Sequence, residues 1–448
     1  MPPTYSYLTL AQAKTELAQR LYDPTKQFWL DAELGIYINE ALRTWNALTG
    51  YWRGDFTFQS QSSVTWYDLT DTTNLPNTLR PFTVFDTELY TIIQYHLLEP
   101  AVGVNPWTGS SAQFQATDLL NAVQRQRDEL LGVTGCTTLR RLVPAVAGRI
   151  TLPDTVIDVR RMAYLPAIGS PSTLWPEDTW AEQSFQQNYA QLPAATPLTY
   201  LMSTQPPIAF DAFPPPAFAG SYELLTVEGD GILSVSSPTL IKIPDDWTHI
   251  LKWGALADLL SRESNAKDSL RAKYCEARYK MGLAMLSDAP ALLALRIANQ
   301  VLQVDSARSA DNYRVGWQAE TPKQPDMAFH AGLNLIGLAS TPDAGPYSLT
   351  ATVVQNAPLP ANDAAQIQAG RDEIDAIIEY AQHIATFKMG GSEFLSTLPL
   401  LEHFHKTASI YNSKLQEMAE FTSILYGLSQ RQERMAPRTD APVSEVIQ

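Results

Sequence analysis

The most regular spacing of apolar positions lies in residues 243–299 and predicts two long amphipathic helices followed by a third. Pro244 and the two aspartates after it begin the first helix, because proline suits a first helical turn and carboxylates complement the positive end of the helix dipole. A polar break at 264–265 separates the first helix from the second. The apolar face of the first helix is broad enough for burial and comprises Trp247, Ile250, Leu251, Trp253, Gly254, Leu256, Ala257 and Leu260.

Four further helices precede this stretch, with a small β-hairpin between the second and the third. Capping signals place their ends: a Thr9–Gln12 capping box begins the first helix, and Thr49-Gly50 ends the second, because glycine accepts the left-handed cap. Helical spacing supports each helix, and alternation supports the hairpin. The predicted ranges are 9–22, 31–50, 56–69 for the hairpin, 87–99, and 117 to 132 or 135.

From residue 137 the apolar positions form short runs separated by proline and glycine, which predict β-strands with one brief helix over 176–189. The helical pattern returns at Ile243. We therefore expect a β-rich domain, residues 136–242, inserted into an α-helical domain made of residues 1–135 and 243–299; insertion is feasible because the ends of a domain usually lie close together. The expected strands are 139–143, 150–152, 156–162, 198–202, 208–210 and 222–227.

The remainder of the chain predicts strands and then a helical hairpin. Residues 300–361 are expected to be an irregular segment with strands near 333–339 and 347–354. A helix from Asn362 to Phe387 is followed by a nearly heptad-spaced stripe, and the two form a C-terminal helical hairpin over 362–430, packed internally or, alternatively, between subunits. The stripe comprises Leu401, Phe404, Ala408, Tyr411, Leu415, Met418 and Leu425.

Residues 431–448 are polar with two prolines and are expected to form a tail. The predicted fold class is therefore α+β: a discontinuous α-helical domain with an inserted mostly-β domain, plus a C-terminal helical hairpin.

Bulk properties narrow the classes of function. The net charge of -15 argues against a general polyanion binder, which needs clustered cations, but it allows nucleic acid to pass an acidic wall without sticking. The two cysteines, Cys136 and Cys275, are too few for a four-cysteine zinc site and are typical of a reducing compartment. The sequence shows neither a secretory signal nor an apolar run long enough for a membrane span, which predicts synthesis in a cytoplasm.

Side chains that could carry chemistry are few and scattered. The best metal candidate combines Glu379 and His383, which share a helix face, with His403 and His405 beside Glu402. The last two point in opposite directions on a helix, so histidines of the surface or of the hairpin interface are the preferred interpretation. Two further histidines lie among apolar residues and are expected to be core or interface histidines: His96 and His249.

No sequence motif predicts catalysis. The turn at 228–231 lacks the repeated acids of a calcium loop, and there is no nucleophile elbow, phosphate-binding loop, dinucleotide-binding glycine motif or HExxH. We predict a protein that is not an enzyme, with no catalytic residues, cofactor or metal. An enzyme whose site residues are far apart in sequence is the alternative.

The densest basic region of this acidic chain lies on the second helix of residues 243–299, where helical spacing places apolar residues inward and cations outward. One interpretation is the solvated side of an amphipathic helix. The other, slightly preferred, is a docking surface for an acidic partner subunit. The interface candidates are Lys267, Arg271, Lys273, Arg278 and Lys280.

Two segments of the chain are considered together, with a β element between them. The first is an amino-terminal helix, Leu30–Arg53 (LDAELGIYINEALRTWNALTGYWR), and the second is a later helix pair, Ile243–Leu283 (IPDDWTHILKWGALADLLSRESNAKDSLRAKYCEARYKMGL). The first contains an acidic step, Asp31–Leu34, and the later pair contains Arg271, Tyr274, Glu276 and Tyr279. In this combination, over about residues 9–299, the chain resembles the head-to-tail adaptor (connector) proteins of tailed bacteriophages, which sit below the portal. The inserted β domain is larger than such an adaptor needs, and residues 301–448 have no counterpart.

The resemblance implies a non-enzymatic structural protein of the virion neck. It would form a homo-oligomeric ring of roughly a dozen copies, with the portal protein above, tail or nozzle proteins below, and DNA passing through without specific binding. Two alternatives remain: another tail or neck component, such as a tail tube or baseplate protein, and, less favoured, a glycan-binding or hydrolytic protein. The last would use aromatic residues of the β domain: Trp175, Trp180 and Tyr200.

Overall fold

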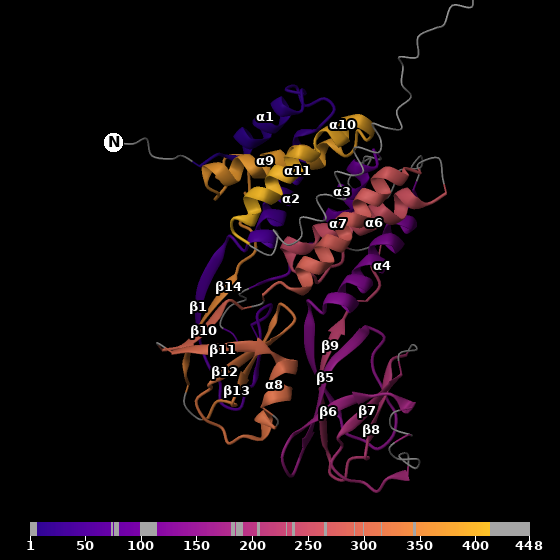
Figure 1. Ribbon diagram of the computed structural model, residues 1–448, viewed down its shortest axis with the longest axis vertical. Coiled ribbons are helices and arrows are strands. Elements are labelled where there is room, and N and C mark those ends of the chain that lie inside the picture. Colours follow the sequence, from indigo (N-terminus) through magenta and orange to yellow (C-terminus); the bar gives the residue numbers. More distant parts are fainter. Residues whose placement is uncertain are drawn as a thin grey trace, which may run out of the picture.

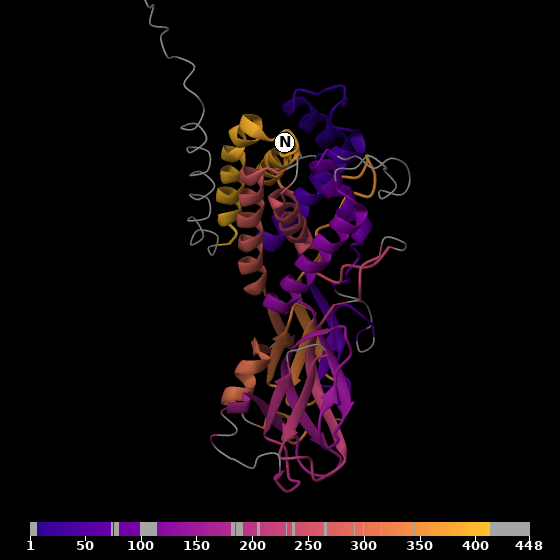
Figure 2. The same cartoon turned by 90° about the vertical axis from the view of Figure 1, so that its right-hand side faces the viewer.

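The chain folds into a layer of helices at one end and two β-sheets that lie side by side at the other (Figures 1 and 2). This arrangement confirms the predicted α+β class and the C-terminal helical hairpin. The computed structural model describes residues 7–412 except for 73–74, 76–79, 99–113, 181–183, 185–190, 204–206, 230, 235–237, 264–266, 291, 299, 315 and 344–345. The predicted stripe beyond Tyr411 and the tail lie outside the described residues.

The helices begin and end largely where their capping signals place them. The capping box of Thr9 and Gln12 is formed at the start of α1, and Gly50 and Gly135 adopt the left-handed conformation directly after α2 and α4. The helical layer contains α1 (Leu10–Arg20), α2 (Asp31–Thr49), α3 (Asp86–His96), α4 (Ala116–Thr134), α6 (His249–Ser261), α7 (Ser269–Ser287), α9 (Arg371–Thr386), α10 (Gly391–Ser396) and α11 (Leu398–Ser409).

The inserted region forms the first sheet. Its strands are β3 (Thr138–Pro144), β4 (Ile150–Thr151), β5 (Val156–Pro166), β6 (Ser172–Glu177), β7 (Thr199–Ser203), β8 (Ala209–Phe213) and β9 (Gly220–Glu228). They pair in the order β3-β9-β5-β6-β7-β8-β4, and all pairs are antiparallel except β6 with β7.

The second sheet draws on both ends of the chain. Its strands are β1 (Arg53–Gln59), β2 (Trp66–Asp68), β10 (Ala294–Ile297), β11 (Gln300–Ser306), β12 (Met327–Ala331), β13 (Leu335–Ala339) and β14 (Ser348–Val354). The order is β1-β14-β10-β11-β12-β13-β2, with β11 and β12 the parallel pair. The short helix α8 (Ala307–Tyr313) lies in the crossover between that pair.

The second sheet corrects several expectations. The hairpin predicted over 56–69 does not form, because β1 pairs with β14 and β2 with β13 at opposite edges of the sheet. The third helix expected before residue 299 is instead β10, which completes that sheet between β14 and β11. Residues 300–361 therefore share a sheet with the amino-terminal strands.

Two predicted helices also differ from the structure. The helix expected from Asn362 begins only at Arg371, because the residues between them form turns that hydrogen-bond to the start of α1. The brief helix expected over 176–189 is partly wrong, since its first two residues end strand β6; most of its length lies outside the described residues.

The two sheets have the same topology. When the strands of each sheet are numbered in chain order, both sheets place them first, seventh, third, fourth, fifth, sixth, second, with the parallel pair between the fourth and fifth. The register also agrees. Met327, which begins β12, pairs with the fourth strand on one side and with the last residue of β13 on the other; Thr199, which begins β7, does the same with β6 and the last residue of β8.

The helices repeat together with the sheets. A helix of 19 residues, a left-handed glycine and a strand of seven residues follow one another in α2–Gly50–β1 and in α4–Gly135–β3. A helix pair then follows each sheet, and the pairs pack alike: α9 on α2 as α6 on α4, α11 on α9 as α7 on α6, α11 on α2 as α7 on α4, and α1 on α9 as α3 on α6.

The chain thus consists of two copies of one unit, nested one inside the other. Repeat B, residues 86–287, lies between β2 and β10 of repeat A, which comprises residues 10–68 and 294–409. An ion pair recurs at the same place: Glu33, near the start of α2, binds Lys388 just past α9 at 2.9 Å, and Asp118, at the same position of α4, binds Arg262 just past α6 at 2.8 Å.

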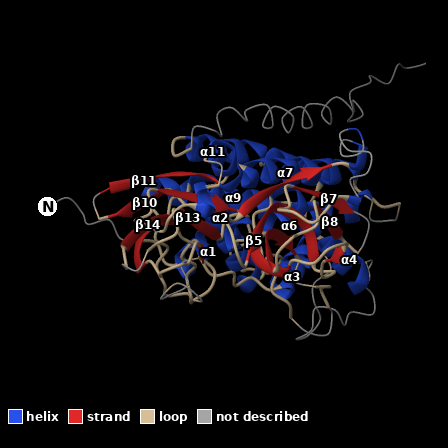
Figure 3. Ribbon diagram, turned by 90° about the horizontal axis from the view of Figure 1, so that it is seen from below, coloured by secondary structure: helices blue, strands red, loops and turns tan. Residues whose placement is uncertain are grey.

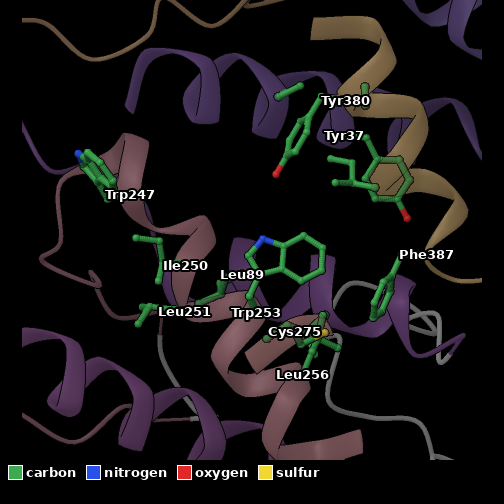
Figure 4. Packing of buried hydrophobic residues seen from close by; sticks show 14 of the residues in the cluster. Tyr37, Leu89, Trp247, Ile250, Leu251, Trp253, Leu256, Cys275, Tyr380 and Phe387 are labelled. Atoms are coloured by element: carbon green, nitrogen blue, oxygen red, sulfur yellow. The ribbon is translucent and has the colours of Figure 1, made fainter. Parts of the chain in front are cut away.

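The helices of both repeats share one core. Trp253 of α6 lies at its centre, with Tyr380 and Phe387 of repeat A facing it and Cys275 of α7 below (Figure 4). The rings of Trp253 and Phe387 are 5.5 Å apart. Burial of these apolar faces supplies most of the stability of such a layer.

Buried charges also join the repeats. Lys252 of α6 is fully buried and its Nζ lies 2.5 Å from Glu40 of α2, which is itself 3% exposed. Between the sheets, Arg161 of β5 binds Asp311 of α8 at 2.6 Å, and both side chains are buried. Burial lowers the pKa of Lys252, while the Glu40 carboxylate opposes that shift.

We predict that Glu40→Leu alone costs about 3–5 kcal/mol of unfolding free energy, because it leaves Lys252 buried without its counter-charge. The double substitution Glu40→Leu/Lys252→Met removes both charges and is expected to recover most of that loss. Urea denaturation of the full chain measures both values. A loss below about 1 kcal/mol for the single substitution would show that the pair does not hold the repeats together.

Candidate interface groove

Helix α7 presents two faces to different surroundings, and the five predicted interface cations divide between them. Arg271 and Arg278 turn toward repeat A, whereas Lys267, Lys273 and Lys280 face away from it. The expectation that all five lie outward was therefore wrong for Arg278, which is 6% exposed, and only partly right for Arg271, whose side chain is 19% exposed.

The inward face of α7 holds helix α9. The Arg278 guanidinium donates to the Tyr380 hydroxyl at 2.5 Å and lies 5.5 Å from the Trp253 ring centre. One turn earlier, the Tyr274 hydroxyl is hydrogen-bonded to His383 Nε2 at 2.7 Å. Arg271 donates to the main-chain carbonyl of Phe387 at 3.2 Å. These contacts stabilise an interface inside the chain and offer nothing to an outside partner.

The outward face of α7 forms one wall of a groove of about 610 Å³ between α4, α6 and α7. Small residues of α6, Gly254 and Ala257, line its floor. Gly254 lets the helices approach closely, since a Cβ there would lie 2.6 Å from Gln126 Oε1 and 2.9 Å from Tyr279 Cδ2. Its polar lining includes Lys267 just before α7, Lys273, Glu276 and Lys280 from α7, and Arg125 and Glu129 from α4.

Ion pairs at the rim leave the groove open to solvent. Lys280 binds Glu276 at 2.6 Å, and both side chains are more than half exposed. Lys267 pairs with Glu263 in the same i,i+4 arrangement, and Arg125 pairs with Asp258. Exposed pairs of this kind contribute at most about 1 kcal/mol each, so they can be exchanged for contacts with a partner at little cost.

The histidines considered for a metal are not brought together. His383 is buried between Tyr274 and the Thr397 hydroxyl, while His403 is exposed and its Nδ1 lies 2.5 Å from Glu379. His405 is buried on the other side of α11. Among the described residues there is no group of three metal-ligating side chains. His96 is fully buried against Lys252, as expected for a core histidine, while His249 donates from Nδ1 to the Asp246 main-chain carbonyl at 2.8 Å.

The residues considered for calcium or glycan binding have separate surroundings. Glu228 binds Arg141 at 2.8 Å, and Asp230 lies outside the described residues. Of the three aromatics considered for glycan binding, Tyr200 is buried in the sheet core, whereas Trp175 and Trp180 are 38% and 82% exposed. They therefore do not form a common surface with Tyr200.

A second hollow, of about 300 Å³, lies where α2 meets the second sheet and is lined by Arg53, Arg80 and Asp246. Burial raises the pKa of Asp246 to about 6, but its carboxylate accepts from Asn46 Nδ2 and from the Ala357 main-chain N–H. Through these two hydrogen bonds Asp246 links α2 to the loop between β14 and α9. The carboxylate therefore has a structural role.

Comparison with known proteins places the chain in no family: no family model matches it, and no curated protein matches it. Within the part of the chain that the structure describes, none of the helices has the length and apolar content to cross a bilayer.

Reasoning from sequence missed the partners of the inward cations. Helical spacing alone could not tell which of two opposite faces of α7 meets another helix, because both carry cations. The recurrence of a 19-residue helix ending in Thr-Gly, with an acid near its start, was the available signal: it marks α2 and α4 as equivalents and points to a second helix layer beside the first.

We predict that Arg278→Ala lowers the unfolding free energy by about 2–4 kcal/mol, because it removes a buried hydrogen bond and the packing of the arginine against two rings. Lys280→Ala, on the outward face of the same helix, is the matched control and is expected to change it by less than about 0.5 kcal/mol. Chemical denaturation of both variants measures the difference. Equal losses would contradict the assignment of the two faces.

Acid is expected to destabilise the helical layer. Burial lowers the pKa of His96 and His383 well below the usual 6.5, and that of His405 to about 3. The unfolded chain then binds more protons than the folded one below pH 6.5, so each histidine makes the unfolding free energy fall by about 1.4 kcal/mol per pH unit toward acid. Burial also lowers the pKa of His249 to about 3. Burial raises the pKa of Asp246 to about 6, so Asp246 acts in the opposite direction below about pH 6, as one group against these four histidines.

The measurement is urea denaturation between pH 5 and pH 7. His405→Leu is expected to lower the average slope of stability against pH over this range by about 1 kcal/mol per pH unit, because the unfolded histidine is only partly protonated near pH 7. Phe404→Leu, a neighbouring buried substitution, is the control: it lowers stability at every pH and leaves the slope unchanged. An unchanged slope in His405→Leu would contradict the prediction.

Proposed function

We propose that this protein is a non-enzymatic structural component of a tailed-bacteriophage virion, a head-to-tail adaptor that links the capsid to the tail. The observation that carries the proposal is the packed unit itself. A helix with an acidic first turn, α2, precedes a β domain, and the helix pair that follows the domain packs back on that helix. The resemblance joined α2 to the segment of α6 and α7, whereas in the structure α9 and α11 pack on α2. Repeat B has the same arrangement, with α6 and α7 on α4.

The shape of the molecule supports a layered role. The helices lie at one end and both sheets at the other, so one end can dock under a portal while the other receives tail proteins (Figure 2). In the proposed ring the portal protein lies above, tail or nozzle proteins lie below, and genomic DNA runs through the channel. The protein would be made in the host cytoplasm and be found in the virion.

The charge of the chain suits that channel. A net charge of -15 per chain, multiplied around a ring, produces a negative field that repels phosphates. DNA could then slide past without being bound. Mechanism in this proposal is therefore a matter of shape and charge, with no reacting residue.

The test is the composition of purified phage particles from a host that produces this protein. We expect the chain to be present in them, and electron microscopy to place it directly below the portal, with its helical end toward the portal. Absence from purified particles would overturn the proposal. Density in the tail tube or baseplate would overturn the adaptor role in favour of the other structural alternative.

A further inference from the structure

The nested repeat shows what covers a groove of this kind. In repeat A, the surface of α2 and α9 that corresponds to the open groove of repeat B is covered by α6 and α7. Tyr380, His383 and Phe387 of α9 are buried there, as is Glu40 of α2. Their partners are residues of repeat B: Lys252, Arg271, Tyr274 and Arg278.

The same positions in repeat B are the lining of the groove. Lys388 and Arg262 are equivalent, because each binds the acid near the start of the 19-residue helix of its repeat. Counting back from these two residues, Tyr380, His383 and Phe387 correspond to Gly254, Ala257 and Ser261. Counted from the start of the 19-residue helices, Glu40 corresponds to Arg125. All four of these repeat B residues line the groove. The groove is thus the vacant counterpart of an interface that repeat A has filled.

The covering face also has a counterpart. Tyr380 stacks on Phe404 at 4.4 Å, and Gly254 packs on Tyr279, which makes Phe404 and Tyr279 equivalent. The residues just before them, His403 and Arg278, are then equivalent as well.

The neighbours of this pair agree. Arg278 lies over Trp253, and His403 binds Glu379, which holds the position of Trp253 in α9. The difference lies in exposure: the side chain of His403 is 56% exposed and that of Glu379 is 21% exposed, whereas Arg278 and Trp253 are buried.

We infer that the groove between α4, α6 and α7 receives repeat A of a second copy of this chain, through the face that carries Glu379 and His403. Charge favours this occupant. The groove lining carries four cations, Arg125, Lys267, Lys273 and Lys280, and three carboxylates, Glu129, Asp258 and Glu276, an excess of one positive charge. The incoming face carries carboxylates at Asp375, Glu379 and Glu402.

The contact joins two different faces, so it is heterologous and can be repeated from chain to chain. The repeats sit side by side in the same orientation, with α11 and α7 along one edge, α9 and α6 inside it, and α1 and α3 toward the other edge (Figure 3). If the step between chains matches the step between repeats, the chains close into a ring that contains twice as many adaptor-like units as chains. On the proposed function, a ring of about a dozen units would then hold about six chains instead of a dozen.

The test uses cysteine substitutions in the full chain at Ala257, in the groove, and at His403, on the incoming face. The two native cysteines are buried. We expect a bismaleimide to cross-link an equimolar mixture of Ala257→Cys and His403→Cys chains into dimers, and the double variant into a ladder. Neither single variant should cross-link alone, because the contact pairs unlike faces. Each chain is tested at about 1 mM, where even a weak complex is populated.

No cross-link in the mixture, or equal cross-linking of a single variant with itself, would overturn the inference. A second variant is independent of cross-linking: Ala257→Arg fills the groove and is expected to reduce the mass in light scattering to that of one chain. Ser170→Arg, at the exposed turn between β5 and β6, adds the same charge elsewhere and should leave the oligomer intact. An oligomer that survives Ala257→Arg, with thermal unfolding unchanged, would also overturn it.

This inference can fail separately from the proposed function. Rings that assemble through the groove in a protein absent from virions would overturn the adaptor role alone. Presence below the portal without the cross-link would overturn the groove contact alone.

Discussion

The contact between Lys252 and Glu40 constrains the whole helical layer. Neither charge reaches water, so each needs the other, and the two belong to different repeats. If repeat B separated from repeat A, each of these buried charges would lose its counter-charge. The aromatic contacts around Trp253 then fix the angle at which the repeats meet, and the sheets below follow that angle, held by Arg161 and Asp311.

Nesting explains why this constraint matters more here than in a tandem repeat. Strands β1 and β2 find their partners only after the whole of repeat B has been made, because β13 and β14 follow repeat B in the chain. Closing so long a loop costs entropy, although the cost grows slowly with length. Repeat B offsets part of it by folding into a body whose flanking segments meet, since Arg80 before it and Ala289 after it line the same hollow.

The sequence was sufficient for features that depend on neighbours along the chain. Capping by Thr9 and by Gly50, and the strand spacing of the inserted sheet, are local signals, and each confirmed element rests on one of them. The failures share one cause. Residues 56–69 alternate as a hairpin would, but alternation does not say which strand is the partner, and β14 lies far away in sequence. Arg278 has the spacing of a surface cation, but its partner Tyr380 comes from a distant helix.

The candidate groove shows the same limit more sharply. The five cations of α7 were recognisable from sequence, while their division into an internal and an external set depends on α9, which no local pattern connects to α7. Comparison of equivalent positions in the two repeats relates the two sets to each other. Where repeat A has Tyr380 and His383, repeat B has Gly254 and Ala257: the large side chains bury a permanent interface, while the small residues line the open groove.

This difference between filled and open positions follows from when each interface forms. The internal interface forms once, during folding, and can bury arginine and histidine because their partners are always present. A groove that waits for another chain must stay hydrated and soluble beforehand, which favours small floor residues and exposed lysine–glutamate pairs at the rim over buried aromatics. In the proposed assembly, the chain therefore uses one interface for folding and a second, at equivalent positions, for contact with another copy.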